Sequence, residues 1–478
     1  MPVQRGPGGY HRRMTDANKP AGHPATRIER DSMGEMAVPA EALYGASTQR
    51  AVLNFPISGR PMPPAFIHAL ALVKQAAAET NLELGLLEPP LAAALIAAAA
   101  EVAGGAHDDA FPIDIYQTGS GTSTNMNANE VIARLASQRL GGPVHPNDHV
   151  NAAQSSNDTI PTAMQLAAAI EIDRALLPAL AGLQASLAAK AVEFDSVVKT
   201  GRTHLQDATP IRLGQEFSGY AGQVEASIRR TRAALDELLS VPLGGTAVGT
   251  GINMPAGAAA RTCDRLATLT GLPVHETDNH FHAQAALDAV IAAHGALKSV
   301  ALSLWKIASD VRLMGMGPRA GLAELALPET QPGSSIMPGK VNPVIVESLT
   351  MVVARVVGND ATIAFSQTGS LLELNVMMPV VATALLESIE LLAASAANFS
   401  KRAIDGLTAT GRGPELVEQG LMLATALAPR IGYDAAAKLA KAALASGRTI
   451  RELALEQGVP AAELDVLLDP DRMTRPEA

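Results

Sequence analysis

The chain has 478 residues and a formal net charge of −10, with 47% hydrophobic residues, 3% aromatic residues and one cysteine. This much apolar mass excludes disorder over most of the chain, and the acidic balance argues against nucleic-acid binding. A single cysteine, Cys263, excludes an internal disulfide and a thiolate metal cluster, and it fits a reducing, cytoplasmic compartment. The aliphatic composition predicts an all-α fold, because sandwiches and barrels use aromatic and β-branched residues.

The first 26 residues read as a separate segment. Their basic residues lie among Gly and Pro, and no acidic residue precedes Asp16. Transit peptides are also basic and poor in acids, so this alternative stays open, but the amphipathic pattern of such a peptide is absent. We therefore expect a disordered tail over 1–26, or a start of the chain at Met14.

Helical patterns dominate the rest of the chain. Residues 64–103 predict helices with a break at Glu88-Pro89-Pro90, a loop-rich region follows over 104–129, and shorter helices are expected in a small C-terminal domain after residue 411. Apolar residues recur with helical spacing over 162–194, 214–239, 283–314, 344–365 and 376–402. Long helices with so little polar surface predict a bundle that is buried in an oligomer.

No segment reads as a membrane span. The apolar run 91–100 is closed by Glu101 and is too short to cross a bilayer. The uncharged stretch 238–260 is interrupted by Gly and Pro. We therefore expect no membrane partner.

Five polar, Gly-rich stretches separate the helices and are unsuited to a hydrophobic core. They cover residues 117–127, 145–148, 154–159, 200–207 and 333–343. Hydroxyl and amide side chains predominate in them, together with His204 and Lys340. A polar cap or turn explains any one of these stretches equally well, but five in one chain favour a binding site.

Nucleotide-binding motifs do not fit these stretches. The span from Gly333 to Gly339-Lys340 has one residue too many for a Walker loop, and Val341 follows in place of Ser or Thr. Gly249-Thr-Gly251 lacks the third glycine of a dinucleotide fingerprint and has no clear strand before it. The sequence therefore predicts no nucleotide cofactor.

Metal sites and nucleophile elbows fit no better. His145 and His149 are four residues apart, and the histidines at 275, 280 and 282 cluster, but neither set has a zinc spacing. Ser120 lies between two glycines, yet no strand pattern precedes it as a nucleophile elbow requires. We predict no metal.

The chemistry that remains is the binding of a small dianion. Hydroxyl and amide side chains, with loop amides before helix N-termini, supply neutral donors, and Lys340 adds a positive charge. This set suits a dicarboxylate better than a polyphosphate. His204 supplies a group that titrates near neutral pH. The stretch 333–343 contains two glycines and two prolines, and it predicts a mobile loop that closes over a substrate.

The sequence of this stretch, Gly-Ser-Ser-Ile-Met-Pro-Gly-Lys-Val-Asn-Pro, resembles the signature of the fumarase/aspartase superfamily. The resemblance extends from about Arg27 to the C-terminal segment. Thr203-His204 and the Leu-Gln-Asp-Ala-Thr-Pro that follows resemble class II fumarases in particular. Aspartate ammonia-lyases are expected to carry Gln in place of His204 and Ala in place of Gly339, so both positions favour water over ammonia as the leaving group.

The resemblance implies a homotetramer whose core is a bundle of long helices from all four subunits, with active sites assembled from three subunits. It implies an N-terminal helical and loop domain over 27–154, the long-helix bundle over 155–411, and a small C-terminal helical domain over 412–478. It also implies a reaction without metal or cofactor.

The implied activity is the reversible anti-elimination of water from L-malate to fumarate, a step of the tricarboxylic acid cycle. The C3 proton of malate leaves first, through an aci-carboxylate intermediate. An aspartate ammonia-lyase is the nearest alternative. A catalytically inactive helical structural protein is the alternative from another class.

Position by position, the resemblance makes Ser334 the base that takes the C3 proton. It makes His204 the acid on the hydroxyl side and Glu347 the group that hydrogen-bonds and tunes His204. The residues implied to hold the substrate carboxylates are Ser120, Gly121, Thr122, Asn125, Ser155, Ser156, Asn157, Thr203, Ser335, Lys340, Val341 and Asn342. A second, outlying dicarboxylate site is implied at His145, Pro146, Asn147 and Asp148.

The role of Ser334 needs a physical explanation. A proton next to a carboxylate is weakly acidic, because its removal adds charge to a substrate that is already a dianion. Fixed donors and Lys340 aimed at the carboxylate oxygens would stabilise that charge, at about 3 kcal/mol for each donor. Serine is a poor base unless its alkoxide is stabilised, and loop amides with Lys340 are suited to do so. A role for Ser334 in binding substrate or closing the loop is the alternative.

Overall fold

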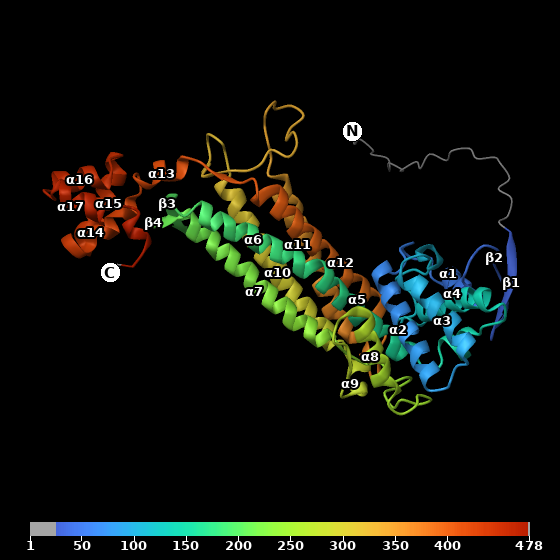
Figure 1. The fold of residues 1–478 in the computed structure, drawn as a ribbon. Coiled ribbons are helices and arrows are strands. Elements are labelled where there is room, and N and C mark those ends of the chain that lie inside the picture. The colour runs from blue at the N-terminus through green and yellow to red at the C-terminus, as the bar shows by residue number, and fades with distance from the viewer. Residues whose placement is uncertain (1–24, 477–478) are drawn as a thin grey trace, which may run out of the picture.

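The computed structural model describes residues 25–476. The tail expected over 1–26 lies almost entirely outside the described residues, in which β1 (Thr26–Asp31) is the first element. β1 pairs antiparallel with β2 (Gly34–Pro39), from Thr26 opposite Pro39 to Asp31 opposite Gly34. This hairpin lies at the N-terminal end of the molecule (Figure 1).

Four helices follow in the N-terminal part: α1 (Ala46–Asn54), α2 (Pro64–Glu83), α3 (Pro89–Ala103) and α4 (Thr122–Leu140). The break expected at Glu88-Pro89-Pro90 separates α2 from α3, because Pro is accepted in the first turn of a helix and not further inside. The loop expected over 104–129 ends too late. Gly121, with φ of 72°, turns the chain directly into α4.

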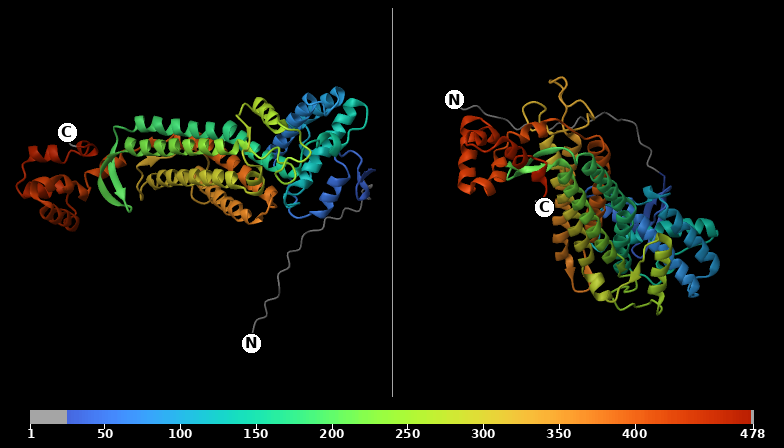
Figure 2. Two further views of the ribbon diagram at one scale, coloured as in Figure 1. Left: turned by 90° about the horizontal axis from the view of Figure 1, so that it is seen from below. Right: turned by 60° about the vertical axis from the view of Figure 1, so that its left-hand side comes forward.

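The long helices form one bundle (Figures 1 and 2). It consists of α5 (Ser156–Glu171), α6 (Leu177–Glu193), α7 (Leu213–Leu238), α10 (Asp288–Met314), α11 (Val344–Ser366) and α12 (Met378–Phe399). A single π-helical turn over Ile172–Leu176 joins α5 to α6. The helices expected over 214–239 and 344–365 are confirmed to within one residue at each end. At 27 residues, α10 is about 40 Å long, which sets the length of the bundle.

A small unit lies where the bundle meets the N-terminal part. It contains α8 (Ala258–Thr270), α9 (His280–Ala285), and the parallel strands β5 (Ser240–Val241) and β6 (His275–Glu276). β8 (Ser370–Leu371) pairs with β9 (Leu374–Asn375) in the connection from α11 to α12.

A β-hairpin extends from the opposite end of the bundle. β3 (Val198–Thr203) and β4 (Gln206–Arg212) pair antiparallel around a two-residue turn, whereas the sequence predicted only a polar loop over 200–207. His204 and Leu205 form this turn with φ of 56° and 59°. Positive φ at both positions matches the right-handed twist of the flanking strands.

The C-terminal segment has its own hydrophobic core. Five short helices follow the bundle: α13 (Arg412–Val417), α14 (Ala424–Ile431), α15 (Tyr433–Ser446), α16 (Ile450–Glu456) and α17 (Ala461–Leu467). Apolar residues between Leu423 and Leu468 pack together, whereas the main core runs without interruption from Met62 to Leu407. β7 (Leu325–Ala326) and β10 (Thr408–Ala409) pair near the start of this segment.

The expectation that no segment reads as a membrane span is wrong when the helices are judged by their length and composition alone. Three helical segments are long and apolar enough to cross a membrane: Ser156–Glu193, Asp288–Met314 and Met378–Ile404. All three lie in the bundle, where an apolar helix is also what a shared core requires. Several large apolar side chains on α10 and α11 remain exposed, among them Trp305, Met351 and Phe365. Such an uncovered apolar surface is typical of a subunit that associates.

A buried polar contact joins three of the bundle helices. His294 of α10 is fully buried, with Nδ1 3.1 Å from Asp360 of α11 and Nε2 2.9 Å from the hydroxyl of Ser388 on α12. The arrangement has the residue types of a catalytic triad, but Ser388 is completely buried and cannot meet a substrate. Burial lowers the pKa of His294, although the Asp360 carboxylate opposes the shift.

We expect the bundle to lose stability as the pH falls, with His294 as one cause. The pKa of His294 is depressed in the folded chain, so unfolding takes up a proton below the unfolded value near 6.5, at a cost of up to about 1.4 kcal/mol for each pH unit. Its stabilising effect is complete above that value and is lost as the pH falls. His294→Gln should flatten the acid side of a plot of Tm against pH. An unchanged slope in His294→Gln would contradict the assignment.

Candidate active site

One group of predicted residues gathers where α4 and α5 begin. Ser120 Oγ lies 2.8 Å from Thr122 Oγ1, which lies 2.8 Å from Ser156 Oγ across a separation of 34 residues. Asn157 donates to the Ala247 carbonyl at 2.8 Å and so ties α5 to the loop after β5. We call this set the donor cluster; its members are Ser120, Gly121, Thr122, Ser155, Ser156 and Asn157.

Helix geometry makes the donor cluster suited to anions. Ser155 caps α5: its side-chain oxygen accepts the N–H of Asn157, and its own N–H donates to Asp158 Oδ1 at 3.0 Å. Two helix N-termini therefore point their partial positive charge and hydroxyl groups toward the same place. Gly119 keeps the cluster close to α12, because a Cβ there would lie 1.8 Å from the Val376 carbonyl oxygen.

Asn125, which was predicted to hold substrate, is buried directly behind the donor cluster. Its side chain is 2% exposed, so it lies behind the donor cluster and not on its surface. Its amide nitrogen donates to Asn151 at 3.1 Å, and its amide oxygen accepts from Thr159 at 3.3 Å. Asn125 therefore supports the cluster from the protein side, and a direct contact with substrate would need these bonds to rearrange.

The stretch 333–343, here called the signature loop, is closed at its base by backbone contacts. Gly333 N–H donates to the Lys340 carbonyl at 2.9 Å, and the Asn342 side chain donates to the Gly333 carbonyl at 2.6 Å. A Cβ on Gly333 would lie 2.5 Å from the Lys340 oxygen, so only glycine allows this closure. Within the loop, Ser334 Oγ accepts the N–H groups of Ile336 and Met337 at 3.2 and 3.0 Å. Two such donors stabilise negative charge on that oxygen.

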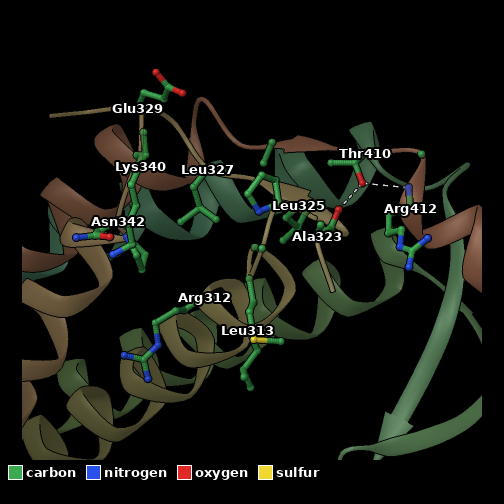
Figure 3. Close-up of a pocket in the computed structure, with 18 of the residues that line it drawn as sticks. Arg312, Leu313, Ala323, Leu325, Leu327, Glu329, Lys340, Asn342, Thr410 and Arg412 are labelled. Atoms are coloured by element: carbon green, nitrogen blue, oxygen red, sulfur yellow. Dashed lines mark hydrogen bonds between the residues drawn. The ribbon is translucent and has the colours of Figure 1, made fainter. Parts of the chain in front are cut away.

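A cavity of about 810 Å³ opens beside the signature loop (Figure 3). Lys340, Val341 and Asn342 line it, together with Arg312 from the end of α10 and Arg412 from the start of α13. Glu329 and Glu415 also reach its wall, whereas Ser334 and Ser335 do not line it. Neither arginine could be identified from the sequence, because neither lies in one of the five polar stretches and each is separated from the signature loop by other elements.

The His204 hairpin is held by a buried ion network at its base. Arg202 lies 2.8 Å from one oxygen of Glu324, and Lys199 lies 3.2 Å from the other. The Glu324 side chain is fully buried, which makes the network a fixed anchor. His204 is exposed at the turn with a positive φ, an uncommon conformation that persists where the surroundings impose it. Thr203 precedes it at the end of β3.

The predicted catalytic and binding residues therefore fall into separate groups within one chain. The signature loop leads directly into the N-terminal end of α11. The donor cluster lies near the start of α12, which follows the opposite end of α11, because the Met378 N–H donates to the Gly119 carbonyl there. With 23 residues, α11 is about 35 Å long, so this distance separates the two groups. Glu347 is exposed on the first turn of α11, and the described residues show no contact between it and His204.

The outlying stretch 145–148 forms a compact turn of its own. His145 Nδ1 accepts the Asp148 N–H at 3.0 Å and lies 3.1 Å from Asp148 Oδ2, and the His145 N–H donates to His149 Nδ1. Pro146 and Asn147 lie in the π-helical turn over Pro146–Val150. The side chains of His145 and Asp148 are largely exposed, and nothing joins them to the donor cluster among the described contacts.

Comparisons with known proteins agree with this architecture. Residues 34–358 match a family described as Lyase, and residues 423–475 match one described as Fumarase C C-terminus. The chain is 52% identical over 461 residues to a Methylorubrum extorquens protein named fumarate hydratase class II, covering 95% of this chain and 98% of the relative. A Mycobacterium tuberculosis protein of the same name is 53% identical over 442 residues, covering 92% and 93%.

Solved structures point the same way. The crystal structure of a recombinant class II fumarase from Schistosoma mansoni superposes with a TM-score of 0.92 at 40% identity, covering 94% of this chain and 99% of that one. A fumarate lyase:delta crystallin from Brucella melitensis gives a TM-score of 0.91 at 43% identity, covering 95% and 100%. The predicted fumarase/aspartase-like, all-α fold is thereby confirmed, and the chain belongs to the class II fumarate hydratase family of lyases.

Proposed function

We propose that this chain is a fumarate hydratase that interconverts L-malate with fumarate and water. The observation that carries the proposal is its 52% identity, over 95% of its length, to a protein named fumarate hydratase class II. His204 and Gly339 add a second argument, because both differ from the residues expected in an aspartate ammonia-lyase. The donor cluster and Lys340 supply the neutral donors and positive charge that a dicarboxylate needs.

The functional unit in this proposal is a homotetramer with active sites shared between three subunits. Two features support it. The donor cluster and the signature loop of one chain lie about a helix length apart, so they serve one site only if they come from different chains. The exposed apolar side chains of α10 and α11 also need a covering surface, which neighbouring copies of the bundle would supply.

In the proposed mechanism, Ser334 removes the C3 proton of malate. Its oxygen already accepts two backbone N–H bonds, which stabilise the alkoxide form that a base requires. The electrons of the broken C–H bond move onto the oxygens of the adjacent carboxylate, where Lys340 and the donors stabilise the aci-carboxylate.

The C2–O bond then breaks, and the leaving hydroxyl takes a proton on the His204 side, so that water departs and fumarate remains. Glu347 would hold His204 of a neighbouring subunit in this arrangement, because no such contact forms within one chain. Ser335, Val341, Asn342 and Thr203 would complete the carboxylate contacts, and the turn at His145 would form the outlying dicarboxylate site.

The proposal includes the division of the chain into domains at residues 27–154, 155–411 and 412–478. The separate core between Leu423 and Leu468 supports the last boundary. The first boundary cuts through a continuous core, so the N-terminal part and the bundle are expected to unfold together. We also propose a cytoplasmic location and a reaction that needs neither metal nor cofactor.

One assay separates the candidate functions. Fumarate absorbance is followed with L-malate and then with L-aspartate as the substrate. We expect fumarate to form from malate only. Turnover of aspartate alone would replace the hydratase by an ammonia-lyase, and turnover of neither would favour a structural protein that keeps the fold without activity.

A further inference from the structure

Lys74 is a buried amine that the proposed mechanism does not use. It lies on α2 with 1% of its surface exposed. Its ammonium donates to Asn151 Oδ1 at 2.9 Å, and among the described residues no carboxylate forms an ion pair with it. A buried lysine without a paired carboxylate is costly for the fold, because the charge loses its hydration. The position of Lys74 therefore calls for a functional explanation.

Hydrogen bonds connect Lys74 to the donor cluster. Asn151 Oδ1 accepts from Lys74 and also from the amide nitrogens of Asn125 and Asn129, at 3.1 and 3.2 Å. Asn125 lies about one turn after Thr122 on α4. The single hydroxyl proton of Thr159 is shared between the Asn125 amide oxygen, at 3.3 Å, and the Ser155 carbonyl, at 2.8 Å. A continuous path therefore runs from the ammonium to both helix starts.

Two further features distinguish this network. The buried amide oxygen of Asn129 has no hydrogen-bond partner among the described residues, so the network is not fully satisfied. Burial also lowers the pKa of Lys74 to about 7, with the negative charge of Asp158 opposing the shift. Burial therefore makes the neutral form of Lys74 accessible near neutral pH in the protein without substrate.

The charges around Lys74 are few. Among the described residues, the negative charge of Asp158 on α5 raises the pKa of Lys74 against the effect of burial, and Asp158 is itself buried. Its carboxylate accepts the N–H groups of Ser155, Gly244 and Thr246 at 3.0, 3.1 and 2.9 Å. Because these three bonds engage the Asp158 carboxylate, and no ion pair joins it to Lys74 among the described residues, the ammonium stays available to respond to a negative charge at the donor cluster.

We propose that Lys74 is a positioning residue for the donor cluster: it fixes Asn125 through Asn151 and supplies a buried positive charge behind a bound carboxylate. The inference rests on the proposed dicarboxylate substrate and adds a consequence to it. A dianion on the cluster favours the charged form of Lys74, so substrate binding takes up a proton at a pH just above the pKa of about 7.

Proton uptake is measured by calorimetric titration with succinate, a dicarboxylate that cannot eliminate water. The titration is repeated in buffers with different ionisation enthalpies at a pH slightly above the pKa of Lys74. We expect a fractional proton uptake in the wild type that disappears in Lys74→Met. We also expect the KM for L-malate to rise about tenfold in Lys74→Met, with a smaller change in kcat. The reason is that the hydrogen-bond donors of the donor cluster are displaced in this variant but are still present.

Lys190→Met is the matched control. Lys190 is also buried, at 7% exposure, but it lies at the other end of the bundle and donates to Glu193 and the Leu407 carbonyl. Its substitution should leave both the proton uptake and KM unchanged. Asn151→Asp is the second variant, in case Lys74→Met does not fold: a carboxylate beside Lys74 keeps the ammonium charged, so the uptake should also vanish.

Three results would overturn the inference: no proton uptake in the wild type, undiminished uptake in Lys74→Met, or undiminished uptake in Asn151→Asp. Failure of the proposed function looks different. A wild-type protein that binds succinate but does not convert malate would refute the hydratase and leave the succinate test of Lys74 valid. A wild-type protein that does not bind succinate would refute the dicarboxylate site itself, and the role of Lys74 with it.

Discussion

Ser334→Ala is expected to lower kcat for L-malate by about a thousandfold while the protein keeps its fold and its oligomeric state. The reason lies in the signature loop, where two backbone N–H groups already point at the Ser334 oxygen and would stabilise its alkoxide. Removing the hydroxyl removes the group that accepts the C3 proton. The two ends of the loop stay joined by the hydrogen bonds among Gly333, Lys340 and Asn342. The measurement is steady-state kinetics in both directions, with sedimentation to follow the assembly.

Ser335→Ala is the matched control for this prediction, since it is the neighbouring serine and is assigned to carboxylate binding only. It should raise KM and leave most of kcat. Ser334→Thr keeps a hydroxyl and should retain part of the activity. If Ser334→Ala kept kcat within a few-fold of the wild type, Ser334 would be a residue that binds substrate or closes the loop, and the base would have to be found elsewhere.

Two inactive variants are expected to restore activity when they assemble together. His204→Asn and Ser334→Ala each remove one catalytic group, but in the proposed tetramer these groups reach one active site from different subunits. Coexpression gives mixed tetramers in which some sites receive both intact residues. Random assortment predicts recovery of about a quarter of the wild-type activity. The measurement is malate turnover by the copurified mixture, compared with each variant alone.

Ser334→Ala with Lys340→Ala is the control pair for complementation. Both residues lie on the same signature loop, so the loop supplied by either variant lacks one of them. Every mixed site therefore receives a damaged loop, and no recovery of activity is expected. Recovery in neither pair would contradict sites shared between subunits. It would mean that the hairpin and the signature loop of one chain serve the same active site.

The acidic character of the chain makes the local design of the site important. A net charge of −10 repels a dianion at long range, so attraction must come from nearby groups. Lys340, Arg312 and Arg412 provide positive charge around one cavity, while the donor cluster has no cationic side chain of its own. Lys74 is the cation that lies behind that cluster, which gives its burial a reason.

The sequence by itself determined the parts that depend on local pattern. Helical spacing predicted the long bundle helices, and Pro89-Pro90 predicted the break between α2 and α3. The signature loop, His204 and Gly339 pointed to the family, which the relatives confirm. These features could be predicted because periodicity, proline chemistry and a long motif are properties of neighbouring residues.

Only the tertiary structure decided which of these residues meet. The hairpin around His204 forms because its two flanking segments pair, and a polar stretch alone does not specify that pairing. Asn125 is buried and Lys74 lies behind it because α2, α4 and α5 pack together, a long-range result that spacing cannot give. Because α11 and α12 pack antiparallel, the signature loop and the donor cluster lie at opposite ends of the bundle in one subunit. Whether two polar stretches share a site depends on which helix ends lie together, and that is fixed by packing across the whole bundle.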